Sequence, residues 1–274
     1  MNFVPLAFYA AALIAYALHF TRRQPAVGRT ATTLLVLAAL AHTFVVGMQT
    51  MDVGHVPFAN ASAFTNTFVL LLALSYLYVE MTTDERAMGI FILPMLAALQ
   101  SIPALKPGHE ERAALLTGPL FNLHVSSLLF AYASFALACV IGITYVLLFK
   151  EIKAKHLGFF YARLPSLQVL DSMNQKAIVV GWVFLTVGIV VGAIWTGQVR
   201  GTSPGDPRVQ AMSLQDPKIL VALVSWVIYS FEAFAARRIG WGGRRTAYLS
   251  ALGFVLVLLN FVPISYFLTR SHDF

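Results

Sequence analysis

The chain of 274 residues is 58% hydrophobic and only 11% charged, whereas soluble globular domains carry about 25% charged residues. This composition excludes an ordinary soluble protein and predicts an all-α, polytopic membrane protein, because the apolar residues occur in long blocks. A net charge of +7 would suit nucleic acid, but the basic residues stand between apolar blocks, so we expect no nucleic-acid partner.

Eight apolar blocks approach the length of about 20 residues that an α-helix needs to cross a bilayer. They span residues 3–20, 31–48, 65–80, 87–103, 123–149, 177–197, 217–236 and 247–268. Because they account for most of the chain, we expect a single integral membrane domain over residues 1–274. The first block is followed, not preceded, by basic residues. That order is the reverse of a secretory signal, so we expect this block to be retained.

The positions of Lys and Arg predict the orientation. With the N-terminus outside, 13 of the 19 basic residues fall in inner connections and six in outer segments. This excess is what the positive-inside rule requires. We therefore expect both termini to be extracytoplasmic in a multi-pass protein of a membrane such as the bacterial cytoplasmic membrane.

A few small or polar residues stand out inside the apolar blocks. Gly188 and Gly192 form a GxxxG pair, which favours close approach of a neighbouring helix. Asn66 and Glu232 are functional candidates because polar groups in membrane helices are rare. Glu232 precedes Arg237 by five residues, so we expect it to reach the inner interface. The single cysteine, Cys139, allows no intrachain disulfide and is expected to be a small core residue.

Five histidines lie near the predicted outer surface. His109, in "KPGHEER", is expected to be a solvated loop residue, and the other four are candidates for a site. His42 is in the outer part of the second block, His55 is in a Gly-Pro turn, His124 opens the fifth block and His272 stands near the C-terminus. Each also has a plain structural interpretation: a buried helix residue, a turn residue, a neighbour of a helix cap and a terminal tail.

His124 and His272 form the pair that best suits a metal cofactor. Haem fits because its iron takes axial histidine ligands, its porphyrin face packs on aromatic rings and its propionates pair with basic residues. Trp195 and the outer loop 198–216 form the candidate platform. The basic candidates near it are Arg200, Arg208 and Lys218. Zinc is the competing interpretation, but the chain has no HxxxH motif and no Cys/His cluster.

The stretch "LQDPKILVALVSW" begins the seventh block. Asp216 is expected to cap a helix whose first residue is Pro217. A helix N-terminus also favours an anion, so Asp216 and Lys218 are candidates for the edge of the haem site as well.

Four segments together resemble the cytochrome c assembly family, which includes CcsA/ResC haem-lyase subunits and HemX-like proteins. They are "GHVPFANASAF", "NLHVSSLLFAYASFALACVIGITYVLLF", "LDSMNQKAIVVGWVFLTVGIVVGAIW" and "DPKILVALVSWVIYSFEAFAARRIGWGGRRTAYLSALGFVLVLLNFV". They occur in the family's order over most of residues 42–272. The resemblance implies an extracytoplasmic, tryptophan-rich haem platform between two axial histidines, matched here by His124 and His272.

The platform departs from the family pattern. Gln215 stands where a tryptophan precedes Asp216, Ile219 replaces a glutamate, and Phe234 stands near the place of a membrane histidine. These differences weaken the expected stacking surface.

The leading hypothesis is a haem-handling protein of cytochrome c biogenesis that holds haem for delivery to apocytochrome c. Because the thioether reaction needs a partner's CxxCH motif, the chain would be at most one component of a haem lyase, with a second membrane subunit. The first alternative is a HemX-like regulator or assembly factor with little bound haem. The second is an integral subunit of a larger membrane complex, or a transporter.

Overall fold

The computed structural model describes residues 1–58, 60–106, 118–155, 158–202 and 217–261. Within these ranges the regular structure is helical, which confirms the all-α prediction. The helices in chain order are α1 (Phe3–Arg22), α2 (Pro25–Val53), α3 (Ala61–Thr83), α4 (Gly89–Leu105), α5 (Pro119–Lys153), α6 (Phe159–Arg163), α7 (Leu167–Thr202), α9 (Pro217–Ile239) and α10 (Arg244–Phe261).

Each of the eight predicted spans coincides with a helix. Helices α1, α2, α3, α5 and α7 are long and apolar enough to cross a membrane. Helix α4 has 17 residues, the lower limit of about 17 for a transmembrane helix. Helix α10 continues to Phe261, and the rest of the eighth predicted span lies outside the described residues. The chain is therefore a polytopic membrane protein.

Two predicted loops are shorter than expected because α5 and α7 extend beyond their apolar blocks. Helix α7 has 36 residues, or about 54 Å at 1.5 Å per residue, compared with about 30 Å of hydrocarbon. Residues 198–202 of the predicted outer loop 198–216 therefore belong to α7. The predicted inner loop 150–176 loses residues 150–153 and 167–176 to helices and contains α6. In both helices the backbone hydrogen bonds continue beyond the ends of the apolar blocks.

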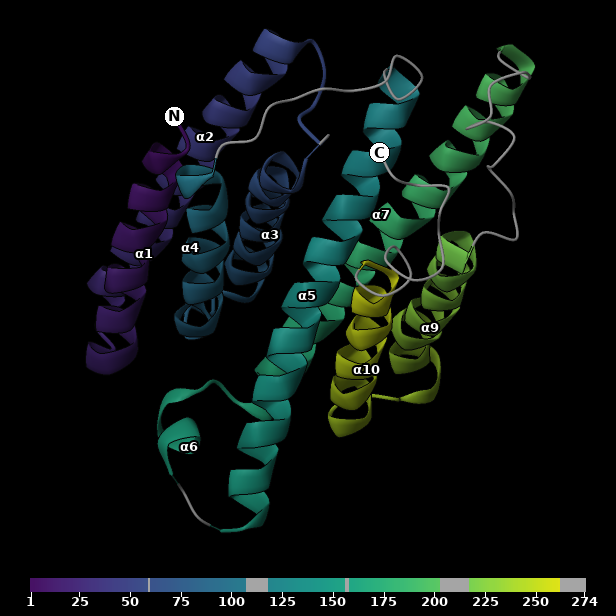
Figure 1. Ribbon diagram of the computed structural model, residues 1–274. Helices are drawn as coiled ribbons and strands as arrows, with labels where there is room; N and C mark the ends of the chain where they lie inside the picture. The colour runs from purple at the N-terminus through teal and green to yellow at the C-terminus, as the bar shows by residue number, and fades with distance from the viewer. Residues whose placement is uncertain (59, 107–117, 156–157, 203–216, 262–274) are drawn as a thin grey trace.

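The helices form two groups that meet at α5 (Figure 1). In the first group, α1 packs against α2 and α4, while α3 packs against α2 and α4. In the second, α5 and α7 form the most extensive pair, with α10 against α5 and α9 against α7 and α10. Helix α3 contacts both α5 and α7 and so joins the groups.

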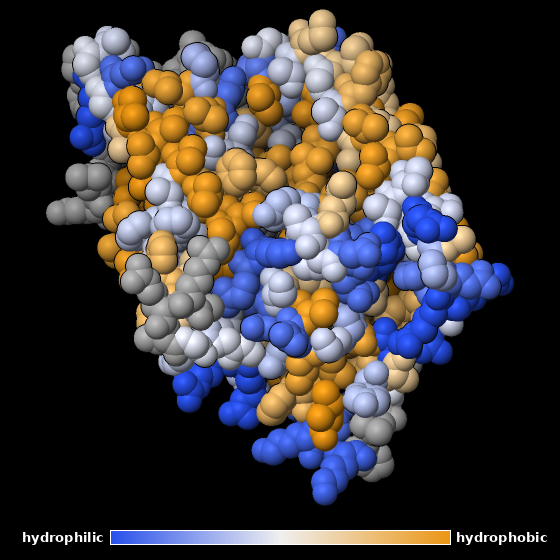
Figure 2. Space-filling view, turned by 180° about the vertical axis from the view of Figure 1, so that it is seen from behind, coloured by the Kyte–Doolittle hydropathy of each residue, from blue (hydrophilic) through white to orange (hydrophobic). Residues whose placement is uncertain are grey.

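The connections α1–α2, α3–α4, α5–α7 and α9–α10 lie at one end of the molecule (Figure 1). This is the end at which the predicted inner basic residues are concentrated. Seen from behind, hydrophilic residues gather toward this lower end and a broad hydrophobic surface lies above it (Figure 2). We call the two ends the basic end and the opposite end.

Small residues and tyrosines fill the spaces between the helices. The fully buried alanines include Ala12, Ala31, Ala38, Ala73, Ala131, Ala133 and Ala138. Because lipid removes most of the hydrophobic drive for helix association, such small side chains stabilise the bundle through close backbone approach. The largest fully buried side chains are Tyr9, Tyr16, Tyr76 and Tyr229, and most of them reach polar partners.

Candidate functional site

His124 lies in the first turns of α5, at the opposite end from the basic connections. Its Nδ1 is 2.7 Å from the carbonyl oxygen of Gly188 in α7. A carbonyl oxygen only accepts, so the neutral imidazole carries its proton on Nδ1 and donates it to Gly188. The lone pair of the ring is then on Nε2, the arrangement found in metal-binding histidines whose second nitrogen donates to a backbone carbonyl.

Glycine makes this contact between α5 and α7 possible. A Cβ on Gly192 would lie 2.5 Å from Cε1 and Nδ1 of His124, and one on Gly188 would lie 2.6 Å from Cδ2 of Leu128. The predicted role of the GxxxG pair in close helix approach is thus confirmed. The neighbour is α5, and the space left by Gly192 is occupied by the imidazole itself.

Trp195 extends the same face of α7, because positions 188, 192 and 195 recur at helical spacing. Its ring is nearly parallel to the imidazole of His124, with centroids 6.4 Å apart and an interplanar angle of 14°. Phe121, one turn before His124 in α5, packs against Trp195 at 5.0 Å. The structure therefore brings two predicted site residues, His124 and Trp195, together and adds Phe121, which sequence reasoning missed.

Several other predicted site residues lie wholly or partly outside the described residues. Asp216 and His272 are in the ranges 203–216 and 262–274. Helix α9 begins at Pro217, as predicted, and Lys218 occupies its first turn, but the position of the Lys218 side chain is not described. The roles of these three residues stay predictions.

His55 follows α2 and is half buried, with Nδ1 3.2 Å from the carbonyl oxygen of Val56. The α2–α3 connection that carries it lies at the same end of the molecule as the beginning of α5 (Figure 1). The two segments belong to different helix groups, so the role of His55 in a cofactor site also stays a prediction.

His42 is fully buried and both of its ring nitrogens are hydrogen-bonded. Nε2 donates to Oδ1 of Asn66 at 3.0 Å, and Nδ1 accepts from the Tyr9 hydroxyl at 3.0 Å. Gln100 also donates to Oδ1 of Asn66, and Asn66 donates to Gln49. This network connects α1, α2, α3 and α4, so it stabilises the first helix group. The sequence singled out His42 and Asn66 but not their partners.

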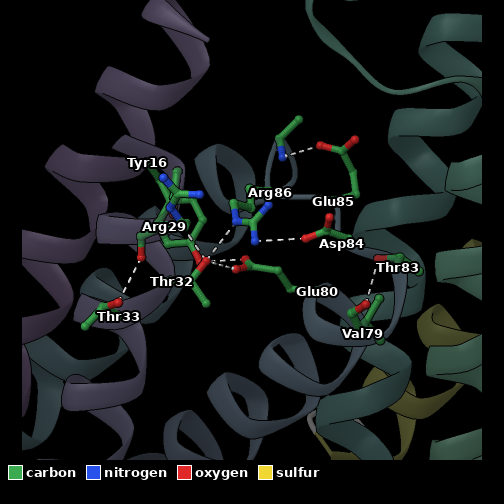
Figure 3. A network of polar contacts seen from close by, with 12 residues as sticks. Tyr16, Arg29, Thr32, Thr33, Val79, Glu80, Thr83, Asp84, Glu85 and Arg86 are labelled. Carbon is green, nitrogen blue, oxygen red and sulfur yellow. Dashed lines mark hydrogen bonds and ion pairs between the residues drawn. The ribbon is translucent and has the colours of Figure 1, made fainter. Parts of the chain in front are cut away.

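A second buried network lies near the basic end and is shown in Figure 3. Glu80, only 1% exposed, accepts from the hydroxyls of Tyr16 and Thr32, each at 2.5 Å. Arg86 donates from Nε to the Thr32 hydroxyl at 3.1 Å and pairs with Asp84 at 2.9 Å. Glu80 was missed because it stands at the end of an apolar block, where a solvated side chain is the usual expectation.

Glu232 does not reach the inner interface as expected. It is 2% exposed, and its Oε1 accepts from the Ser250 hydroxyl at 2.5 Å. The oxygen of that hydroxyl accepts from the Asn174 side-chain amide at 2.9 Å. Helices α7, α9 and α10 therefore share a polar contact inside the second group. Glu232 lies on the face of α9 that packs against α10. The distance along the sequence to Arg237, on which the prediction was based, does not show which face a residue occupies.

Comparison with known proteins agrees with the sequence motifs. A family model described as "Cytochrome C assembly protein" matches residues 3–272. The chain belongs to the cytochrome c assembly protein family.

Members of this family are similar to the chain over most of their length. Cytochrome c biogenesis protein CcsA of Guillardia theta is 26% identical over 259 residues, covering 87% of this chain and 83% of the relative. CcsA of Gloeobacter violaceus is 24% identical over 329 residues, covering 98% and 94%. Protein HemX of Brevibacillus brevis is 28% identical over 262 residues, covering 93% and 91%. The resemblance inferred from the motifs is confirmed, including both named branches.

The described residues contain no group of three or more His, Cys, Asp or Glu side chains able to hold a metal ion. A multidentate zinc site of the usual kind has no counterpart in this part of the protein. A haem site does not require such a cluster, since each axial position needs a single protein ligand. The single imidazole of His124, with aromatic rings beside it, has the chemistry of an axial haem ligand.

Proposed function

We propose that this member of the cytochrome c assembly family holds haem at the extracytoplasmic face and presents it to apocytochrome c. The observation that carries the proposal is the state of His124. Its Nδ1 proton is donated to Gly188, which fixes the ring and places the lone pair on Nε2. A carbonyl acceptor of this kind orients a ligating imidazole and raises its basicity.

The aromatic side chains beside His124 support the same proposal. The Trp195 ring lies beside the His124 imidazole, and the Phe121 ring packs against Trp195. These two aromatic rings would pack on an apolar macrocycle and exclude water. His272 is proposed as the second axial ligand. Asp216, Lys218 and the outer loop would contact the propionate edge.

His42 and His55 have different places in the proposal. His55 belongs to a connection at the same end as the α5 N-terminus and would contribute to the rim of the haem site. Both ring nitrogens of His42 are hydrogen-bonded, to Tyr9 and Asn66. His42 would therefore support the haem site indirectly, by holding α1, α2 and α3 together.

When bound, haem supplies the vinyl groups that react with the thiols of an apocytochrome. The chain would bind haem, orient it and keep water away, while a second membrane subunit completes the lyase. The charge distribution supports extracytoplasmic termini, and we propose the bacterial cytoplasmic membrane as the location. The whole chain, residues 1–274, would act as one membrane domain.

The experiment is an absorption spectrum of the protein purified in detergent from cells supplied with haem. We expect a Soret band that is lost or shifted in H124A and in H272A, and restored in H124A by added imidazole. H19A is the matched control, because His19 lies at the basic end and should leave the band unchanged. A Soret band that is the same in wild type, H124A and H272A would overturn the proposal.

A second candidate function is a HemX-like regulator with little bound haem. The 28% identity to HemX over 93% of the chain and the altered sequence before Lys218 favour it. Deleting the gene separates the two functions. Altered tetrapyrrole levels with normal c-type cytochromes would support the regulator, whereas loss of c-type cytochromes would support haem delivery.

A further inference from the structure

A pocket lies at the basic end of the molecule, where α9 is connected to α10. It is lined by Gly240, Trp241, Gly242, Arg244 and Arg245 and has a volume of about 260 Å³. Small-molecule pockets begin at about 300 Å³, so this pocket is too small for a large cofactor and suits at most a small group such as a phosphate. No role in the proposed haem site involves these residues.

The wall of the pocket is fixed to the rest of the second helix group. The N–H of Gly243 donates to Oδ1 of Asp171 in α7 at 2.7 Å. Gly243 has a positive φ of 66°, and a Cβ there would lie 2.6 Å from the hydroxyl oxygen of Tyr145 in α5. The loop therefore has a defined shape that depends on glycine, and Oδ1 of Asp171 anchors it by accepting its backbone N–H.

Two guanidinium groups are held at the pocket by aromatic rings. The guanidinium carbon of Arg244 lies 5.3 Å from the ring centroid of Phe149, and that of Arg245 lies 5.5 Å from that of Trp241. In the part of the chain that the structure describes, neither arginine is paired with a carboxylate. Both cations therefore remain available to an anion, with part of their side-chain freedom already lost.

Exposed apolar side chains lie beside the pocket. Tyr248 and Leu252 follow Arg244 at intervals of four residues along α10, so all three lie on one face. Tyr248 is 51% exposed and Leu252 is 67% exposed. Phe231 of α9, 46% exposed, packs edge-on against Trp241 at 4.9 Å. Arginine and tryptophan next to exposed apolar side chains are typical of the headgroup layer of a bilayer.

We propose that this pocket binds the headgroup phosphate of an anionic phospholipid from the leaflet at the basic end. The phosphate accepts from Arg244 and Arg245, while an acyl chain lies along Tyr248 and Leu252. Basic pockets between membrane helices bind anionic headgroups in this way.

The test is native mass spectrometry of the full chain in a neutral detergent. Equal amounts of dioleoyl phosphatidylglycerol and dioleoyl phosphatidylcholine are added, and the bound lipids are counted. We expect one preferred phosphatidylglycerol in the wild type and affinity lower by about 30-fold in the R244Q/R245Q double variant, from the usual contribution of two basic residues near a membrane surface. R244K/R245K, which keeps both charges, is expected to keep the preference.

The matched control is K153Q/K155Q, which removes two exposed charges from the same end but outside the pocket. It should bind phosphatidylglycerol like the wild type. Equal lipid binding by R244Q/R245Q and the control would overturn the proposal. A separate arm adds millimolar inorganic phosphate. Inorganic phosphate and phosphatidylglycerol binding with equal apparent affinity would also overturn it, because the acyl chain would then contribute nothing.

Discussion

Replacing Gly192 by alanine tests the contact on which the proposed haem site depends. The new Cβ would lie 2.5 Å from two atoms of the His124 ring, whereas ordinary contacts begin at 3.4 Å. The imidazole must therefore move by about 1 Å. The Nδ1–Gly188 hydrogen bond is 2.7 Å long and tolerates stretching only to about 3.2 Å, so we expect it to break.

The G192A substitution should change the affinity for haem more than it changes the free energy of unfolding. Losing a hydrogen bond costs about 1 kcal/mol, but alanine recovers up to about 1 kcal/mol of helix propensity relative to glycine. The free energy of unfolding should change little. Loss of the carbonyl that orients a metal ligand typically lowers affinity by about 10–100-fold, so we expect a haem affinity of G192A reduced by that factor.

The assay is a haem titration of the purified protein followed by the Soret band, with thermal unfolding in the same detergent. The matched control is G197A. Gly197 lies in the same helix, and a Cβ at this position would meet no atom within 4 Å, so this variant gains helix propensity without touching His124. Equal haem affinities of G192A and G197A would refute the reasoning.

Three further predictions concern stability and orientation. E80A should lower the free energy of unfolding by about 1–3 kcal/mol because the buried Tyr16 hydroxyl loses its acceptor, while Thr32 keeps the carbonyl of Gly28. E80Q, which keeps an acceptor oxygen, should lose less than half as much in the same denaturation assay; equal losses would contradict this. H42A should destabilise the protein by about 2–3 kcal/mol and leave any Soret band unchanged, whereas a shifted band would assign His42 to the haem. In a C139A background, an impermeant maleimide should label Q198C in intact cells but K153C only after lysis; the reverse pattern would invert the orientation.

Most of the fold was predictable because membrane spans have a simple physical requirement. A block of about 20 apolar residues must form a helix in lipid, where backbone groups find no water, and within the described residues every such block is helical. The ends were less predictable. Helices α5 and α7 continue through Lys153 and Thr202, because hydropathy reports where lipid ends and not where backbone hydrogen bonding ends.

The sequence predicted that two of the site residues lie near each other, but not how they contact. Charge predicted a common outer surface for His124 and Trp195, and the structure puts their rings 6.4 Å apart; the side of the membrane stays a prediction. The bond from His124 to Gly188 depends on how α5 and α7 are aligned along their length, which no local pattern determines. The same reason explains why Glu232 was expected at the interface, although it bonds to Ser250.

Electron paramagnetic resonance of the oxidised, haem-loaded protein tests the central claim most directly, since it reports the ligands of the iron. We expect a low-spin signal typical of two axial imidazoles in the wild type and a high-spin signal in H124A, with G197A unchanged. The same spectrum in wild type and H124A would show that this histidine does not bind the iron and would contradict the account.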